Sequence, residues 1–81
     1  MHVRVRLFAS LREATGTADV HLDLPAGATA EEAWRQLVSA HPTLAPRRPS
    51  LAAAVNRRYA TFETLLSEGD ELVFVPPVSG G

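Results

Sequence analysis

Polar and apolar residues alternate at the start of the chain, in segments 2–8 and 18–24. The apolar positions on one side are Val3, Val5 and Leu7 in the first segment and Val20, Leu22 and Leu24 in the second. A period of two is typical of a β-strand that buries one face. Because the two segments follow each other closely, we expect an antiparallel pair. Between them, Ser10 is expected to cap a short helical turn over 11–14 that Gly16 ends.

The next segment has the period of a helix. Thr29 and Glu32 form the sequence signature of a capping box, and apolar residues recur at spacings of three and four up to about His41. Trp34 lies within this apolar stripe and is expected in the core. Pro42 is predicted to end the helix, and the proline-rich segment 42–50 is expected to be a loop.

Three further strands are predicted in the second half of the chain. The apolar run 51–55 is compatible with helix or strand, and a strand is favoured because 56–58 reads as a turn into a short strand at 58–61. Leu65 and Leu66 are expected to pack a loop against the core. After a turn at 67–70, segment 71–75 is apolar on both faces, which is typical of a strand buried in the middle of a sheet.

The predicted order, β-β-α-β-β-β, indicates an α+β fold in which a mixed sheet of about five strands grasps one main helix. This is the β-grasp, or ubiquitin-like, architecture. With 81 residues in all, we expect one domain at 1–75 followed by an extended tail at 76–81.

Composition narrows the possible functions. The chain has 46% hydrophobic residues, no cysteine and a net charge of −1, which predicts a soluble cytoplasmic domain that binds neither nucleic acid nor a membrane. The three histidines lack metal-ligand spacing, so no metal site is expected. All eight basic residues are arginine; without lysine, no side chain here can accept an isopeptide bond.

The last six residues suggest a chemical role. Pro76 and Pro77 lack backbone N–H donors, so the final strand is predicted to end at Val75 and the chain to continue extended. Six extended residues reach roughly 20 Å. Gly80 and Gly81 have no Cβ and could enter a channel too narrow for side chains, delivering the terminal α-carboxylate. The alternative interpretation is an ordinary frayed terminus.

A carboxylate becomes an electrophile when it is activated as an acyl-adenylate. The chain has no G-x-x-x-x-G-K-[ST] phosphate-binding loop. The activating enzyme is therefore expected to be a separate protein.

Segments 3–13, 54–59 and 68–81 together resemble the small subunit of molybdopterin synthase, and Pro-Pro-Val-Ser-Gly-Gly after Glu-Gly-Asp-Glu carries most of that likeness. The resemblance implies a sulfur carrier that is not an enzyme on its own. In the family, an E1-like adenylyltransferase uses ATP and Mg to adenylate the terminal glycine, here Gly81, and sulfur then converts it to a thiocarboxylate. The large subunit receives the tail and passes the sulfur to precursor Z (cyclic pyranopterin monophosphate), forming the molybdopterin dithiolene. The working assembly is a heterotetramer, and the carrier itself binds no cofactor.

The resemblance also implies the site residues. The reacting end is Gly81 with Gly80, the tail held by the partner is Pro76, Pro77, Val78 and Ser79, and the partner interface is Phe8, Arg12, Tyr59 and Val75. Alternation supports Phe8 independently, because it points away from the face of Val3, Val5 and Leu7. Arg4 and Arg6 are interpreted as a solvated strand face, with no role assigned.

Two alternatives share the activated C-terminus. The chain could be a ubiquitin-like modifier joined through Gly81 to target lysines, or a sulfur carrier for thiamine biosynthesis. Pro-Pro-Val-Ser before Gly-Gly favours the molybdopterin branch.

Overall fold

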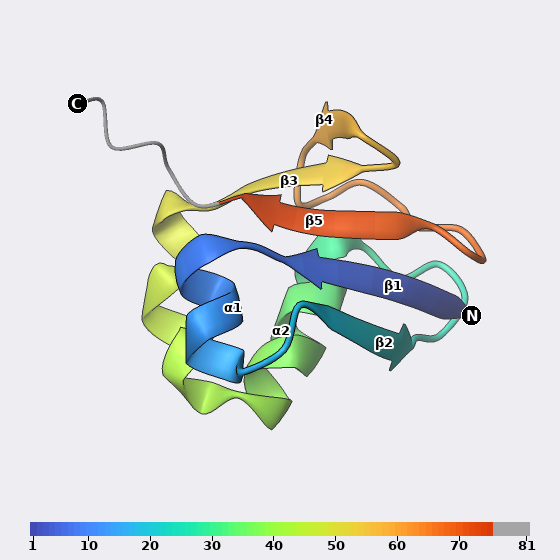
Figure 1. Ribbon diagram of the computed structural model, residues 1–81. Helices are drawn as coiled ribbons and strands as arrows, with labels where there is room; N and C mark the ends of the chain where they lie inside the picture. Colours follow the sequence, from blue (N-terminus) through green and yellow to red (C-terminus); the bar gives the residue numbers. More distant parts are fainter. Residues whose placement is uncertain (76–81) are drawn as a thin grey trace.

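Five strands form one mixed sheet in the order β2-β1-β5-β3-β4 (Figure 1). The computed structural model describes residues 1–75. The strands are β1 (His2–Leu7), β2 (Asp19–Asp23), β3 (Ala52–Val55), β4 (Arg58–Ala60) and β5 (Glu71–Val75). The predicted β-grasp fold is confirmed.

The pairing places the last strand in the centre, as predicted. β1 pairs antiparallel with β2 and parallel with β5. β3 pairs antiparallel with both β5 and β4. β2 and β4 are therefore the edges, and the N-terminal half of the chain joins the C-terminal half through the β1–β5 pair.

The first helix, α1 (Ala9–Thr15), connects β1 to β2. Its N-cap is Phe8, which makes no side-chain capping bond, so the prediction of Ser10 as the cap is wrong. The Phe8 carbonyl accepts the N–H groups of Leu11 and Arg12, which starts the helix two residues earlier. Gly16 ends it in the left-handed conformation, φ 76°, as predicted.

The main helix, α2 (Ala30–Ala40), begins with the predicted capping box. The Thr29 side chain accepts the Glu32 N–H, and the Glu32 carboxylate accepts the Thr29 N–H. α2 lies behind the sheet in Figure 1 and packs on one of its faces.

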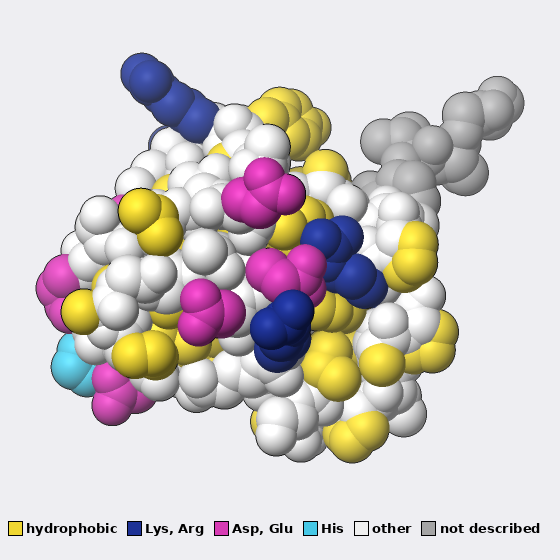
Figure 2. All heavy atoms as spheres, turned by 180° about the vertical axis from the view of Figure 1, so that it is seen from behind, with side chains coloured by type: hydrophobic (Ala, Val, Ile, Leu, Met, Phe, Trp, Pro, Cys, Tyr) yellow, Lys and Arg dark blue, Asp and Glu magenta, His cyan; other side chains and the backbone are white. Residues whose placement is uncertain are grey.

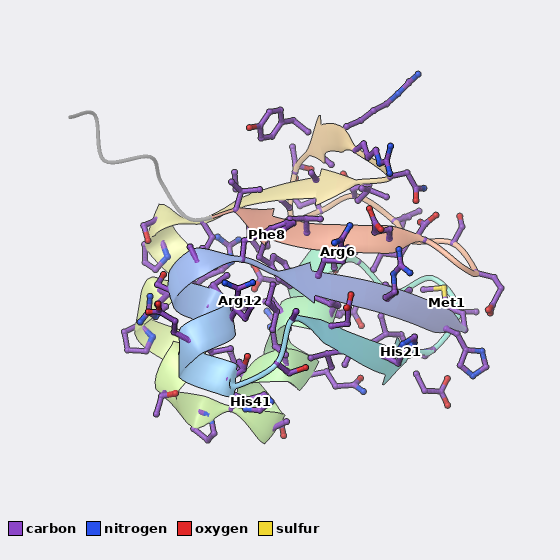
Figure 3. All side chains as sticks on the ribbon, viewed as in Figure 1. Met1, Arg6, Phe8, Arg12, His21 and His41 are labelled. Atoms are coloured by element: carbon purple, nitrogen blue, oxygen red, sulfur yellow. The ribbon has the colours of Figure 1, made fainter. Side chains whose placement is uncertain are left out.

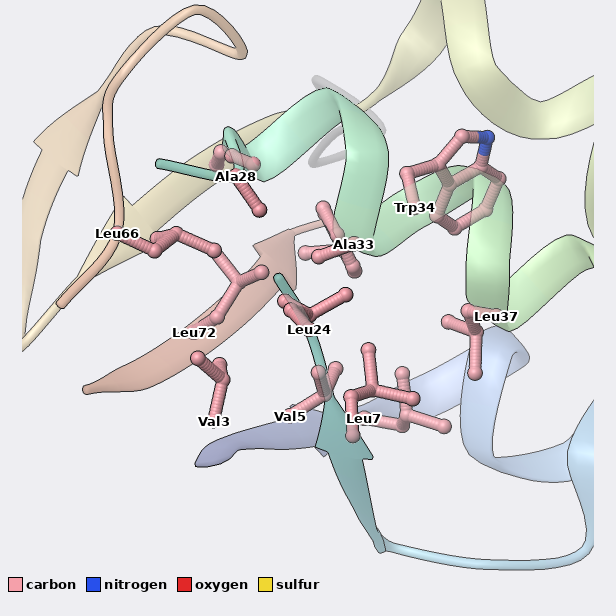
Figure 4. Close-up of a cluster of buried hydrophobic side chains, with 14 of the residues drawn as sticks. Val3, Val5, Leu7, Leu24, Ala28, Ala33, Trp34, Leu37, Leu66 and Leu72 are labelled. Carbon is pink, nitrogen blue, oxygen red and sulfur yellow. The ribbon is translucent and has the colours of Figure 1, made fainter. Parts of the chain in front are cut away.

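The core lies between α2 and that face of the sheet (Figure 4). Trp34 is 3% exposed, as predicted, and its ring meets Phe74 edge-on with centroids 5.0 Å apart. Phe62 stacks on Phe74 at 5.7 Å. The aromatic rings thus connect α2, β5 and the segment after β4.

The expected loop at 42–50 is wrong: Pro42–Ser50 forms the 3₁₀ helix η1. The three prolines rule out an α-helical ladder, yet their fixed φ suits a 3₁₀ turn. Leu44, fully buried, anchors η1 to the core. The Arg48 guanidinium joins η1 to α2 through three hydrogen bonds to the Glu31 carboxylate. Nε donates to Oε1 at 3.0 Å and to Oε2 at 3.3 Å, and Nη2 donates to Oε1 at 2.6 Å.

The turn between β3 and β4 and the turn at 67–70 meet at the end of the sheet where β5 begins. Asn56 and Arg57 both have positive φ, 50° and 69°, in the two-residue turn between β3 and β4. The Asn56 side chain donates to the Asp70 carboxylate at 2.8 Å and accepts the Glu71 N–H at 3.0 Å.

The prediction for Leu65 and Leu66 is half correct. Leu66 is buried, whereas the Leu65 side chain points outward and is 66% exposed. Leu65 forms a bridge with Thr29, and successive residues of an extended segment face opposite sides.

Candidate functional site

The sheet face turned away from α2, here called the outer face, carries one continuous row of side chains across all five strands. The pairing register aligns Asp19 with Arg6, Arg6 with Val73, Val73 with Ala54, and Ala54 with Tyr59. The row is charged at the β2 end and apolar from β5 to β4.

A second apolar row lies beside it at the end of β5. Val75 pairs with Ala52 on one side. On the other side of Val75 lies Phe8, because the residues that precede these two, Leu7 and Phe74, are paired. We call the residues of both rows that are not charged the apolar patch: Phe8, Ala52, Ala54, Tyr59, Val73 and Val75.

The apolar patch corrects one expectation. Segment 71–75 is apolar on both faces as predicted, but only Leu72 and Phe74 are buried, while Val73 and Val75 are partly exposed. Phe8 and Tyr59 are 43% and 80% exposed. The central strand therefore presents an apolar face that residues 1–75 leave partly uncovered, which is typical of a surface for a protein partner. Figure 2 shows the opposite face, on which hydrophobic side chains are interspersed with charged and neutral ones.

A charged strip, made of Arg4, Arg6, Asp19, His21 and Glu71, borders the apolar patch on the β2 side. Glu71 of β5 is shared by two arginines of β1: Arg4 forms a hydrogen-bonded ion pair with it, and Arg6 Nη1 lies 3.9 Å from its Oε2. The hydrogen bond from Arg4 is the main cause that lowers the pKa of Glu71 below its ordinary value. The strip thus balances its charges internally.

Three of the four predicted interface residues lie on the outer face. Phe8 and Val75 are neighbours at the end of β5, and Tyr59 lies on the edge strand β4. Arg12 is exposed on α1, one helical turn beyond Phe8, whose carbonyl accepts the Arg12 N–H at 3.4 Å. In Figure 3, Phe8 and Arg6 lie close together along β1, and Arg12 lies on the adjoining helix. The other predicted site residues, 76–81, lie outside the described residues.

Sequence reasoning missed Ala52, Ala54 and Val73, which complete the apolar patch, and assigned no role to Arg6, which borders it. The sequence did contain a signal for this surface. One main helix covers only one face of the sheet, so a central strand that is apolar on both faces leaves one apolar face uncovered. The alanine positions could not be assigned, because the facing of β3 depends on its register with β5.

Residues 1–75 contain no group of three or more His, Cys, Asp or Glu side chains placed to hold a metal ion. Within the same range, no helix has the length and apolarity to cross a membrane. That the chain binds no metal stays a prediction.

This arrangement can serve a carboxyl-terminal chemistry. Val75 belongs to the apolar patch and is also the last residue before the tail. A protein that covers the patch is therefore in contact with the chain at the point where residues 76–81 begin.

The chain is similar to known proteins along most of its length. The model of the ThiS family matches residues 5–81. The molybdopterin synthase sulfur carrier subunit of Arabidopsis thaliana is 37% identical over 81 residues, covering all of this chain and 84% of the relative. The protein of the same name from Escherichia coli (strain K12) is 39% identical over 84 residues, covering 98% and 99% of the two chains.

A solved structure extends the likeness. The crystal structure of small archaeal modifier protein 1 from Haloferax volcanii superposes with a TM-score of 0.91, at 34% identity and with complete coverage of both chains.

Proposed function

The chain belongs to the ThiS family, and from this membership we propose that it is the sulfur carrier subunit of a molybdopterin synthase. The observation that supports the proposal most directly is the apolar patch on the outer face, which adjoins the last strand residue before the Pro-Pro-Val-Ser-Gly-Gly tail. A carrier needs a surface that a partner recognises and a reactive end that follows directly from it.

In the proposed chemistry, the Gly81 carboxylate attacks the α-phosphate of ATP in an E1-like adenylyltransferase that also holds Mg. Pyrophosphate leaves, and an acyl-adenylate forms. A sulfur nucleophile then attacks the acyl carbon and AMP leaves, which gives the thiocarboxylate. The acyl-adenylate is hydrolysable, so the step belongs in a partner site that excludes water.

In the second stage, the large subunit of the synthase takes up the tail and sulfur passes to precursor Z. Two such transfers supply the dithiolene sulfurs. Gly80 and Gly81 would fit a narrow channel because they lack a Cβ. The preceding tail residues that the large subunit would hold are Pro76, Pro77, Val78 and Ser79. The isolated carrier contributes no catalytic group, and the working assembly is a heterotetramer.

The test is an intact mass of the untagged protein after incubation with the adenylyltransferase, ATP, Mg and a sulfur donor. We expect a species heavier by the exchange of one oxygen for sulfur, mapped to Gly81. A variant lacking Gly81 should fold with unchanged Trp34 fluorescence and stay at its unmodified mass. Only the free acid in the wild-type protein, under conditions where a known sulfur carrier is converted, would refute the proposal.

A second candidate function is protein modification, because the relative with a TM-score of 0.91 is named a modifier protein. The same adenylate would react with a lysine amine of a target protein. Conjugates that disappear when Gly81 is deleted would favour this function. A thiamine-pathway carrier is distinguished by its partner: it would be thiocarboxylated but would not bind the large synthase subunit.

A further inference from the structure

Arg6 lies where the charged strip meets the apolar patch. Its guanidinium carbon is 5.5 Å from the centroid of the Phe8 ring, within the range of a cation–π interaction. Resting on the proposed function, we propose that Arg6 is a positioning residue that holds the Phe8 ring in the orientation in which it docks onto the large subunit.

The guanidinium is itself held from both sides. Arg6 Nε lies 3.8 Å from the Asp19 carboxylate of β2, and Nη1 lies 3.9 Å from the Glu71 carboxylate of β5. These strands flank β1 on either side. The two carboxylates restrict where the Arg6 head group can lie, and so restrict the ring beneath it.

Phe8 needs such support because of its place in the chain. It follows the last residue of β1 and is the N-cap of α1, so no strand pairing of its own fixes it. The ring is 43% exposed. An exposed side chain that must be immobilised on binding lowers affinity, and ordering it beforehand removes part of that cost.

Arg4 supplies a matched control. It lies on the same strand, points to the same face, is 50% exposed and pairs with the same Glu71. It precedes Arg6 by two residues, and within residues 1–75 the guanidinium that lies over the Phe8 ring is that of Arg6, not Arg4. Removing Arg4 therefore removes the same charge from the same strip while leaving the ring's partner in place.

The experiment measures binding of the carrier, with an unmodified C-terminus, to the large synthase subunit encoded by the same genome, by titration calorimetry. We expect Arg6→Ala to weaken binding about 2- to 5-fold, the range of an exposed cation–π contact. Arg6→Met should behave like Arg6→Ala, Arg6→Lys should restore part of the affinity, and Arg4→Ala should change it less than twofold. When the thiocarboxylated carrier is supplied to the large subunit as its sulfur-donating substrate, Arg6→Ala should raise the KM for the carrier and leave kcat unchanged.

Coupling to Phe8 is the decisive readout. In a Phe8→Ala background, Arg6→Ala should have no further effect on the dissociation constant. An equal effect in both backgrounds, or equal effects of Arg4→Ala and Arg6→Ala, would overturn the inference while leaving the proposed function intact. No binding of the wild-type carrier would instead refute the proposed function and the inference with it. Thermal unfolding of every variant controls for folding.

Discussion

The Arg48–Glu31 pair is expected to be a main stabilising contact between η1 and α2. Arg48 donates from Nε and Nη2 to the Glu31 carboxylate, and its guanidinium carbon lies 3.3 Å from the centroid of the Phe62 ring. We consider Arg48→Met, which keeps an apolar stem, and Glu31→Gln, which keeps the size of the side chain.

The magnitude follows from exposure and geometry. Arg48 and Glu31 are 33% and 28% exposed, so their pair should lie at the upper end of the 0–1 kcal/mol range of exposed pairs and below a buried pair. We take about 1 kcal/mol for the pair and about 1 kcal/mol for the contact with the ring. Arg48→Met should then cost about 2 kcal/mol, Glu31→Gln about 1 kcal/mol, and the double variant about 2 kcal/mol, which leaves a coupling energy of about 1 kcal/mol.

The assay is urea unfolding followed by the fluorescence of Trp34, the only tryptophan. Its ring is buried against Phe74 and reports the packing of α2 on the sheet. The slope with denaturant should stay constant while the midpoint falls. A loss of 2 kcal/mol also predicts a Tm lower by about 8–16 °C in a domain of this size.

The coupling should depend on pH. The hydrogen bond from Arg48 is the main cause that lowers the pKa of Glu31 from its ordinary value of 4.5, against the opposing effect of burial. The ionised carboxylate therefore stabilises the folded state fully above pH 4.5, and this stabilisation is lost as the pH falls through the lowered folded-state pKa. Additive single effects at pH 7, or coupling that persists at low pH, would refute the reasoning.

Three further changes test other parts of the fold, with urea unfolding as the measurement. Arg57→Gly should raise the free energy of unfolding by about 0.5 kcal/mol, because glycine accepts the positive φ of this turn at little cost. The control Arg58→Gly, in strand β4, should lower the free energy of unfolding. Loss of stability in both variants would contradict the argument. Thr29→Ala should cost about 1 kcal/mol by removing one half of the capping box, and no change would mean that the Glu32 half suffices. Glu71→Gln should flatten the fall of stability below pH 4.5, since the pKa of Glu71 is lowered mainly by Arg4 and its contribution is lost in acid; an unchanged acid profile would contradict this.

Local signals in the sequence predicted most of the fold. Alternation gave β1 and β2, and the capping box with the apolar stripe gave α2, because these patterns depend only on neighbours in the chain. The prediction of a loop at 42–50 was wrong because proline was interpreted as a breaker of every helix. Proline excludes an α-helix here but not a 3₁₀ helix. The prediction that Ser10 is the cap was wrong because the Phe8 carbonyl accepts the first N–H groups of α1, so the helix begins before Ser10.

The candidate site was predicted only in part. Phe8 follows from the alternation of segment 2–8, and the resemblance supplied Tyr59 and Val75. Val73 and Ala54 depend on how β5 pairs with β3, and the role of Arg6 depends on carboxylates from two other strands. Contacts of this kind join residues distant in sequence, and no local pattern encodes them.

The parallel pairing of β1 with β5 separates the two ends of the chain. Met1 lies where β5 begins, and Val75 lies at the other end of the pair (Figure 1). Six strand residues span roughly 20 Å, so a group attached to the N-terminus would lie about that far from Val75. The Met1 amine donates to the Leu24 carbonyl at 2.6 Å, and an amide N–H in a fusion could make the same bond. The protein should therefore tolerate an affinity tag or a fused domain at its N-terminus without a change at its C-terminus.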